Sequence, residues 1–344
     1  MTTTAAAEEP TVAKAAIARW TRLSSSFTSG FGLFIVALAF VPVVMGKSVV
    51  QDLTGLLILV LMAVMWNALA GYGGLVSVGL QAYIGLGAYA TVWFALHGIN
   101  PYWGMVLATV FCAVVSLPLS LIVLRFRGAQ FAIGSWVVAE AIAIYVGFNS
   151  QLGAGTGISL LQLDSYAPAT REHITYWLTL GMTAFFTLVV FLLLRSRLGA
   201  SLQAIRDDEE AAASVGVRVG VGKRILFVLA SAGCGAAGAM TVANILFIQP
   251  TSIFSVNYSA FMIFMVLVGG IGTFEGPIVG AIILYFIQQQ FGNDGTWYLI
   301  GLGVTAVVFA LLFPRGLWGL LEERAGLRFM PVGYRVKRDG GPQS

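Results

Sequence analysis

Long apolar runs alternate with short polar gaps along most of this chain. A helix needs about 20 mostly apolar residues to cross the hydrocarbon core of a bilayer. Because backbone polar groups find no water in lipid, such runs predict an all-α, polytopic helical membrane bundle of about eight to ten transmembrane helices. The clear runs cover residues 29–46, 53–70, 78–97, 103–124, 129–148, 174–194, 225–248 and 297–313.

Two shorter apolar runs, 257–270 and 277–291, leave two alternatives open. Either both runs cross the membrane, or together they form a re-entrant segment that enters and leaves on the same side. The parity of the crossings is the same in both cases. The orientation of the other helices therefore does not depend on which alternative holds.

Composition agrees with a membrane protein and excludes a soluble domain. The chain is 58% hydrophobic and 10% charged, with a mean hydropathy of +0.88, whereas soluble domains carry about 25% charged residues. Cys112 and Cys234 both lie in apolar runs and fit neither a disulfide framework nor a metal site. We expect both cysteines to be packing residues.

Basic residues predict the orientation, because Lys and Arg in short loops stay on the cytoplasmic side. With both termini in the cytoplasm, only Lys47 and Arg171 lie outside. The net charge of +4 follows from this bias, so it does not indicate nucleic-acid binding. We expect a retained cytoplasmic N-terminal segment at 1–28, a transmembrane domain at 29–321 with a cytoplasmic loop at 195–224, and a cytoplasmic tail at 322–344.

The loop at 195–224 concentrates charged residues between two apolar runs and includes the acidic run Asp207 to Glu210. It is too short to hold a core of its own. If the loop is one helix, its less polar face contains Leu198, Leu202, Ile205, Ala212 and Gly216, with Gly216 as a C-terminal stop.

A helix of this kind either lies at the membrane interface or binds a protein. Interfacial helices usually carry Lys and Arg on the polar face, whereas an anionic cytoplasmic leaflet repels the acidic run at 207–210. The charge pattern therefore favours a protein partner.

Four stretches of the chain resemble one known family of membrane proteins. The loop segment LQAIRDDEEAAASVGV resembles the cytoplasmic loop of the permease subunits of branched-chain amino acid ABC importers. The other three are similar to that family in the same order, and together the four cover about residues 55 to 321. They are NALAGYGGLVSVGLQAYIGLGAYA (Asn67 to Ala90), MVLVGGIGTFEGPIVGA (Met265 to Ala281) and FPRGLWGLL (Phe313 to Leu321).

The resemblance implies a subunit of an ABC transporter in the bacterial inner membrane that has no ATPase and no cofactor of its own. Its implied partners are a second permease, two cytoplasmic ATP-binding subunits that hold ATP and Mg, and a periplasmic solute-binding protein. The sequence agrees, because VPVVMGKS at Val41 to Ser48 lacks the first glycine of a P-loop and GVGKR lacks its hydroxyl residue. We therefore expect this chain not to be an enzyme.

In the family, the loop is the element that couples the permease to the ATPase. Small side chains allow close approach to a partner surface, and charges fix the register of the contact. By resemblance, the ATPase-coupling residues are Ala204, Arg206, Asp207, Glu209, Ala212 and Gly216.

Two glycine-rich regions, 71–79 and 269–280, are candidates for the translocation path, because transporters often build their paths from discontinuous helices. Helix packing through Gly-x-x-x-Gly faces explains the same residues without a transport role. Glu140 is an intramembrane charge, which is either functional or a structural residue paired with another helix. The candidate path residues are Gly73, Gly74, Ser77, Gly79, Tyr83, Glu140, Gly269, Gly270 and Thr273, with Ser135 and Trp136 beside them.

Several alternatives stay open for the substrate and the energy source. Leu80, Ser135 and Trp136 depart from the family pattern, so urea, short amides or other amino acids could be the substrate. An ion-coupled secondary transporter is a second class, although it needs more intramembrane charges than this chain offers. His97 and His173 lie at the edges of apolar runs, away from any catalytic or metal-binding cluster.

Overall fold

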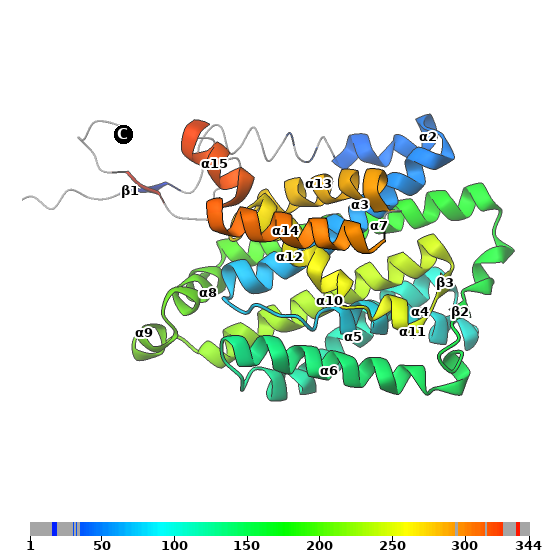
Figure 1. Cartoon of the computed structure of the whole chain (residues 1–344), viewed down its shortest axis with the longest axis horizontal. Helices are drawn as coiled ribbons and strands as arrows, with labels where there is room; N and C mark the ends of the chain where they lie inside the picture. Colours follow the sequence, from blue (N-terminus) through cyan, green and yellow to red (C-terminus); the bar gives the residue numbers. More distant parts are fainter. Residues whose placement is uncertain are drawn as a thin grey trace, which may run out of the picture.

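The computed structural model describes residues 16–18, 30, 32, 35–292, 295–313, 315–325 and 335–337. It is an all-helical bundle whose long helices run roughly side by side (Figure 1). The α-helices are α2 (Val41–Val44), α3 (Lys47–Asn67), α4 (Gln81–Leu96), α5 (Pro101–Val123), α6 (Ala129–Gly147), α7 (Pro168–Arg195), α8 (Arg197–Asp207), α9 (Glu209–Ser214), α10 (Val219–Ile245), α11 (Pro250–Ile253), α12 (Asn257–Gly269), α13 (Gly276–Phe291), α14 (Thr296–Leu312) and α15 (Gly316–Ala325).

Short irregular elements connect these helices. A π-helical turn, η1 (Ala68–Tyr72), continues α3, and two 3-10 turns, η2 (Ser150–Leu152) and η3 (Leu161–Ser165), lie between α6 and α7. The strands form two antiparallel pairs. These are β1 (Ala16–Ala18) with β4 (Arg335–Lys337), and β2 (Ile158–Ser159) with β3 (Phe247–Ile248).

Seven helical stretches of the described chain are long and apolar enough to cross a membrane, so the fold is that of a polytopic helical membrane protein. The predicted run 78–97 is helical only from Gln81 to Leu96, and the run 29–46 lies partly outside the described residues. The seven stretches are Lys47–Tyr72, Pro101–Val123, Ala129–Gly147, Pro168–Arg195, Val219–Ile245, Pro250–Gly269 and Thr296–Glu323.

The bundle has two distinct ends (Figure 1). One end carries α8 and α9 and is called the α8–α9 end; the other carries the paired strands β2 and β3 and is called the β2–β3 end. The backbone N–H of Leu160 donates to the carbonyl oxygen of Leu246 at 2.8 Å, which extends the contact between the two strand segments. The long helices therefore run between the charged loop at one end and the paired strands β2 and β3 at the other.

The two short apolar runs both traverse the bundle. Pro250 lies two residues after the end of β3, and Gly272, just after α12, lies against Arg206 of α8, so α11 and α12 together connect the two ends. α13 then returns, because its Gln289 donates a hydrogen bond to Asp52 near the start of α3 (3.2 Å). The structure therefore favours the crossing alternative over a re-entrant segment.

α3 and α10 form the centre of the bundle. α10 packs mainly against α4 and α5, and α3 packs against α7 and α10. The middle of α10 consists largely of Gly and Ala, and every residue from Ala230 to Ala243 is buried. A Cβ added to Gly238 would collide with the carbonyl of Ile84 on α4. The small residues of α10 thus allow the backbones of α4 and α10 to touch, as in other tightly packed membrane helices.

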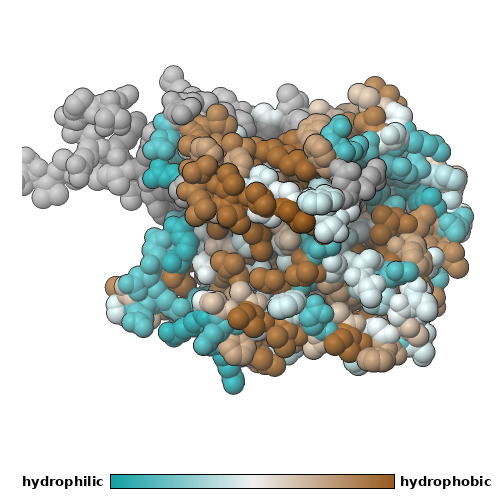
Figure 2. All heavy atoms as spheres, in the orientation of Figure 1, coloured by the Kyte–Doolittle hydropathy of each residue, from teal (hydrophilic) through white to brown (hydrophobic). Residues whose placement is uncertain are grey.

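Apolar side chains cover much of the outside. Figure 2 shows a hydrophobic surface over α14, while hydrophilic residues gather at α8 and α9. Val304, Val307 and Leu311 on α14 are all more than half exposed. Such a surface is stable only against lipid or another apolar protein surface.

Candidate functional site

α8 forms the first part of the charged loop and packs against α10. The side chain of Ser196 accepts a hydrogen bond from the backbone N–H of Leu198 (3.2 Å), which caps the helix. Leu202 and Ile205 are buried and lie over Gly222 of α10. Of the apolar face predicted for the loop, Leu202, Ile205 and Ala212 are buried, whereas Leu198 and Gly216 are exposed.

The loop is two helices rather than one. The chain is extended at Asp208 (φ −155°, ψ 108°), and the carboxylate of Asp208 accepts hydrogen bonds from the N–H groups of Glu210 and Ala211 at 3.0 Å. An aspartate N-cap of this kind starts a new helix. The expectation of a single helix from Leu198 to Gly216 is therefore wrong. Gly216 does follow the end of α9 as predicted, with the left-handed φ of +87° that glycine favours there.

Glu209 connects α9 to the bundle. Its carboxylate forms an ion pair with the ammonium group of Lys223 on α10, with 2.6 Å between Oε2 and Nζ, and the Lys223 side chain is only 12% exposed. The guanidinium of Arg127 lies 4.0 Å away but is 71% exposed, so solvent screens that pair. Of the two ion pairs, the contact with Lys223 is therefore the stronger attachment of α9 to the bundle.

Arg206 connects the loop to the first glycine-rich region. Its Nη1 donates a hydrogen bond to the carbonyl oxygen of Gly71 at 2.9 Å, and its Nε and Nη2 donate to the carboxylate of Asp207 at 3.0 and 2.8 Å. Gly74, at φ +67°, lies directly beside the Arg206 side chain. A movement of α8 would therefore act on the end of the first long helix.

The outward side of α8 and α9 forms an exposed surface, which we call the loop surface. Its largest apolar side chain is Val215, which is 79% exposed. The loop surface consists of Ala204, Asp207, Glu210, Ala211, Val215 and Gly216.

The six predicted coupling residues divide between two locations. Ala204, Asp207 and Gly216 lie on the loop surface. The other three, Arg206, Glu209 and Ala212, face or contact the protein's own bundle.

Asn67 joins the two glycine-rich regions. Its side-chain Nδ2 donates to the carbonyl oxygen of Thr273 at 2.8 Å, and its Oδ1 accepts from the N–H of Gly272 at 2.9 Å. The residue is only 3% exposed. A Cβ added to Gly71 would collide with both Asn67 and Gly272, so the two regions are in direct contact at this point.

The chain from Gly73 to Leu80 is not helical although it lies within the bundle. Gly73 packs against Leu226 of α10. Backbone groups in such a segment need partners, because no water reaches them in the membrane. The indole N–H of Trp66 donates to the carbonyl of Ser77 (2.9 Å), and the hydroxyl of Ser135 accepts from the N–H of Val78 (3.2 Å). Side chains of α3 and α6 thus replace the missing helical hydrogen bonds.

The second glycine-rich region is a tight turn between α12 and α13. Gly270 has φ +133°, and the hydroxyl of Thr273 donates to the carbonyl of Gly270 (2.7 Å) and accepts from the N–H of Gly276 (3.1 Å). A Cβ added to Gly269 would collide with the backbone of Gly276. In this conformation Gly269, Gly270 and Thr273 therefore hold two helices together.

The space around the first glycine-rich region is closed. Ser77, Gly79, Tyr83 and Ser135 surround a void of only about 10 Å³, which holds at most about one water molecule. A Cβ added to Gly79 would collide with the carbonyl of Ser135. In this conformation the predicted path residues Ser77, Gly79 and Tyr83 form a packed contact between helices.

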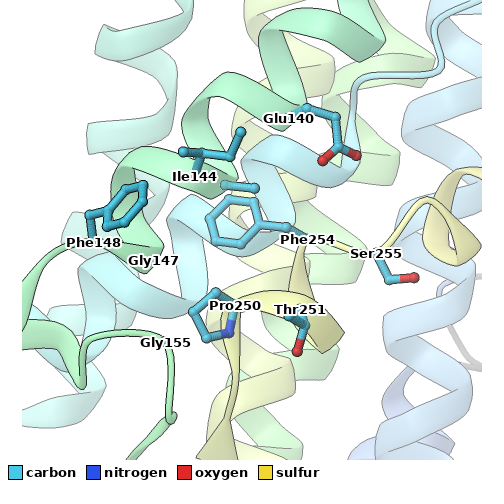
Figure 3. A pocket seen from close by; sticks show the side chains of 10 residues that line it. Glu140, Ile144, Gly147, Phe148, Gly155, Pro250, Thr251, Phe254 and Ser255 are labelled. Carbon is cyan, nitrogen blue, oxygen red and sulfur yellow. The ribbon is translucent and has the colours of Figure 1, made fainter.

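Glu140 lies apart from the other candidates, on the exposed face of α6. It lines an open groove of about 620 Å³ between α6 and α11, shown in Figure 3 with Phe148, Pro250 and Phe254. The indole N–H of Trp136 donates to Oε1 of Glu140 at 3.1 Å. The described residues thus give Glu140 a hydrogen bond within its own helix but no ionic partner.

Sequence reasoning missed three residues of this site. Asn67, Lys223 and Val215 each have a defined structural position: Asn67 bridges the glycine-rich regions, Lys223 pairs with Glu209, and Val215 is the apolar tip of the loop surface. A polar side chain at the end of a buried apolar run is the signal that could have indicated Asn67. Within the described ranges, no group of three or more His, Cys, Asp or Glu side chains could hold a metal ion.

Non-helical backbone that is buried inside a helical membrane bundle is typical of transporters. A family model described as the branched-chain amino acid transport system / permease component matches residues 48–313. The chain therefore belongs to this family of permease components, and it is a multi-pass membrane protein.

Two curated relatives are similar over most of the chain. Both are called high-affinity branched-chain amino acid transport system permease protein LivM. The protein from Escherichia coli (strain K12) is 27% identical and the match covers 86% of this chain and 77% of that protein. The protein from Salmonella typhimurium (strain LT2) is 26% identical, with 86% and 76% covered.

One solved structure is weakly similar. A chain of PsaBC from Streptococcus pneumoniae in complex with Fab superposes with a TM-score of 0.44 at 14% identity, covering 87% of this chain and 98% of that chain. Similarity at this level does not define the function or the path of the substrate.

Proposed function

We propose that this chain is one of two permease subunits of an ABC importer in the bacterial inner membrane, and that the importer carries branched-chain amino acids. The names of the two LivM relatives support this substrate class. In the proposal, two ATP-binding subunits bind on the cytoplasmic side and hold ATP and Mg, and a periplasmic binding protein delivers the substrate.

The contact between Arg206 and Gly71 carries this proposal. A permease without an ATPase must receive motion from outside the membrane and pass it to its transmembrane helices. The 2.9 Å hydrogen bond from the Arg206 guanidinium to the Gly71 carbonyl provides such a connection. It lies next to the Asn67 bridge, which extends the connection to the turn between α12 and α13.

The distribution of charge supports a cytoplasmic location for the α8–α9 end and for both termini. Lys and Arg concentrate on the cytoplasmic side of membrane proteins. Arg127 and Lys223 contact Glu209 at this end, whereas Arg171 pairs with Asp164 of η3, toward the β2–β3 end. The loop surface then faces the ATP-binding subunits.

ATP-driven uptake of labelled leucine into proteoliposomes tests the proposal. The vesicles contain this chain with the second permease, the ATP-binding subunits and the binding protein. We expect Glu209→Lys and Gly216→Arg to abolish uptake. Gly216→Asn is the matched control and should retain uptake, because asparagine is small and tolerates the left-handed backbone that Gly216 adopts.

Two results would contradict the proposal. The first is leucine uptake by this chain alone, with no ATP-binding subunit present, which would favour a secondary transporter. The second is uptake that requires ATP but carries urea or short amides and not leucine, which would overturn the substrate class.

A further inference from the structure

The groove beside Glu140 has the size of a small-molecule site. It measures about 620 Å³, within the range of about 300–1,000 Å³ that is usual for ligand pockets. Pro250 follows β3, and Gly155 lies just before β2, so the groove opens near the β2–β3 end. In the orientation proposed above, this is the side from which the binding protein delivers substrate.

The carboxylate of Glu140 is unusual for the surface on which it lies. Ile133, Val137 and Ile144 on the same helix are each more than half exposed and apolar. A charged group on such a helix is costly in lipid, so it normally faces a polar partner or a water-filled cavity. The Trp136 indole donates one hydrogen bond at 3.1 Å but carries no positive charge. Glu140 therefore offers a binding position for a cation in the groove.

Apart from the hydroxyl residues Thr251 and Ser255, the other walls of the groove are apolar. Figure 3 shows Phe254 and Pro250 across from Glu140, with Ile144 on the same helix as the carboxylate and Phe148 directly after the end of that helix. Phe254 is fixed in place because its ring stacks on Tyr89 with 6.0 Å between the ring centroids. An anionic group next to an apolar wall is complementary to a small molecule that carries both an ammonium group and an apolar side chain.

Three other cavities in the described part of the chain fit such a molecule less well. The void beside Tyr83 is about 10 Å³. A cavity of about 140 Å³ beside Tyr176 has no charged side chain in its walls. A groove of about 380 Å³ beside Leu117 contains Arg224, whose positive charge repels an ammonium group.

We propose that the Glu140 groove is a substrate site of the permease, in which the Glu140 carboxylate binds the ammonium group of the transported amino acid. Ile144, Phe148 and Phe254 contact the apolar side chain of that amino acid. This inference rests on the proposed function, since the second permease closes the open side of the groove. Glu140 is then a specificity-determining residue that favours substrates with an amino group.

Photo-crosslinking tests the site directly. The complete transporter in lipid nanodiscs is irradiated with photo-leucine, a leucine analogue with a diazirine in its side chain, and the labelled peptides are mapped by mass spectrometry. We expect label in peptides that contain residues 140–148 and 250–255. Leucinol, which keeps the ammonium group, should compete with the probe, whereas 4-methylpentanoate, which lacks it, should not.

Substitution of Glu140 gives the second part of the test. We expect Glu140→Gln to lower the labelling about tenfold, because a charge-assisted hydrogen bond is lost, and Glu140→Asp to retain part of it. Asp52→Asn is the control, because it removes a carboxylate that accepts a hydrogen bond from Gln289 and does not line the groove. Its labelling should equal that of the wild type.

The outcomes separate this inference from the proposed function. If the wild-type transporter takes up leucine with ATP but the label falls on other peptides, or Glu140→Gln labels normally, the groove is not the substrate site while the importer proposal stands. If Glu140→Gln fails to assemble with the second permease, Glu140 is an interface residue and the inference is overturned. If the wild type takes up no leucine at all, the proposed function itself fails.

Discussion

The side-chain nitrogen of Asn67 donates a hydrogen bond to the carbonyl oxygen of Thr273, 2.8 Å away and 206 positions later in the chain. The oxygen of the same amide accepts from the N–H of Gly272. One side chain therefore satisfies a donor and an acceptor of a glycine-rich turn that could not form these bonds within its own helix.

Asn67→Ala should destabilise the protein. It leaves the N–H of Gly272 and the carbonyl of Thr273 without these partners, and each unsatisfied buried group costs about 1–3 kcal/mol. Thermal unfolding in detergent, followed by size-exclusion chromatography, should show a lower midpoint. Asn67→Asp keeps the acceptor but replaces the amide donor with a carboxylate at a position only 3% exposed, so its midpoint should also lie below that of the wild type. Equal midpoints for all three proteins would contradict the prediction.

The ion pair of Glu209 with Lys223 should be required for coupling because it fixes α9 to α10. Glu209→Lys places two ammonium groups together and should uncouple the transporter, so that ATP hydrolysis no longer drives uptake. The double variant Glu209→Lys with Lys223→Glu restores opposite charges at the 2.6 Å contact and should recover part of the uptake.

The charge-swapped variant also decides between two roles of Glu209. If Glu209 acts by contacting the ATP-binding subunit, reversing both charges should not help, and the double variant would be as inactive as the single one. The ratio of leucine uptake to ATP hydrolysis, measured in the same vesicles, is the suitable readout.

Val215→Asp should weaken binding of the ATP-binding subunit without unfolding the permease. Val215 is 79% exposed, so the substitution costs little in the isolated chain, but a carboxylate in an apolar partner pocket remains unpaired. We expect at least about tenfold weaker binding in surface plasmon resonance. Gln151→Asp, an exposed position toward the β2–β3 end, is the control and should bind normally. Unchanged binding by the Val215 variant would exclude this residue from the interface.

Gly238→Ala should destabilise the contact between α4 and α10. The added methyl group would collide with the carbonyl of Ile84, and overpacking of this kind costs about 1–3 kcal/mol. Gly181→Ala on α7 is the matched control, because nothing lies within 4 Å of the added methyl and alanine is the better helix former by up to about 1 kcal/mol. Thermal midpoints that fall equally for both variants would contradict the packing argument.

The sequence predicts the helices well where the apolar pattern alone determines them. The runs that became α5, α6 and α7 agree with the predicted ranges to within a few residues, except that α7 begins earlier, at Pro168. The predicted runs end at residue 70 and resume at 78, so they leave most of the non-helical segment 73–80 outside a helix. The apolar pattern could not show which groups bond this segment inside the bundle, because its partners Trp66 and Ser135 come from other elements.

The site was harder to predict than the fold, for a physical reason. Asp208 divides the loop because its backbone is extended and ends α8, while its side chain caps the start of α9. The inward direction of Arg206 and Glu209 depends on Gly71 and Lys223, which no local pattern identifies. Glu140 was recognised from its charge in an apolar run, but its place on an open groove required the structure.

The bridge made by Asn67 also constrains the order in which the protein can be completed in the membrane. α3 is synthesised long before residues 272 and 273. Until those residues are made, the side-chain amide of Asn67 lacks the hydrogen-bond partners that it has in the complete protein. Any chain that stops before the turn between α12 and α13 exposes this amide within the apolar bundle. A truncated product therefore carries an unpaired polar group at a position that the complete chain satisfies.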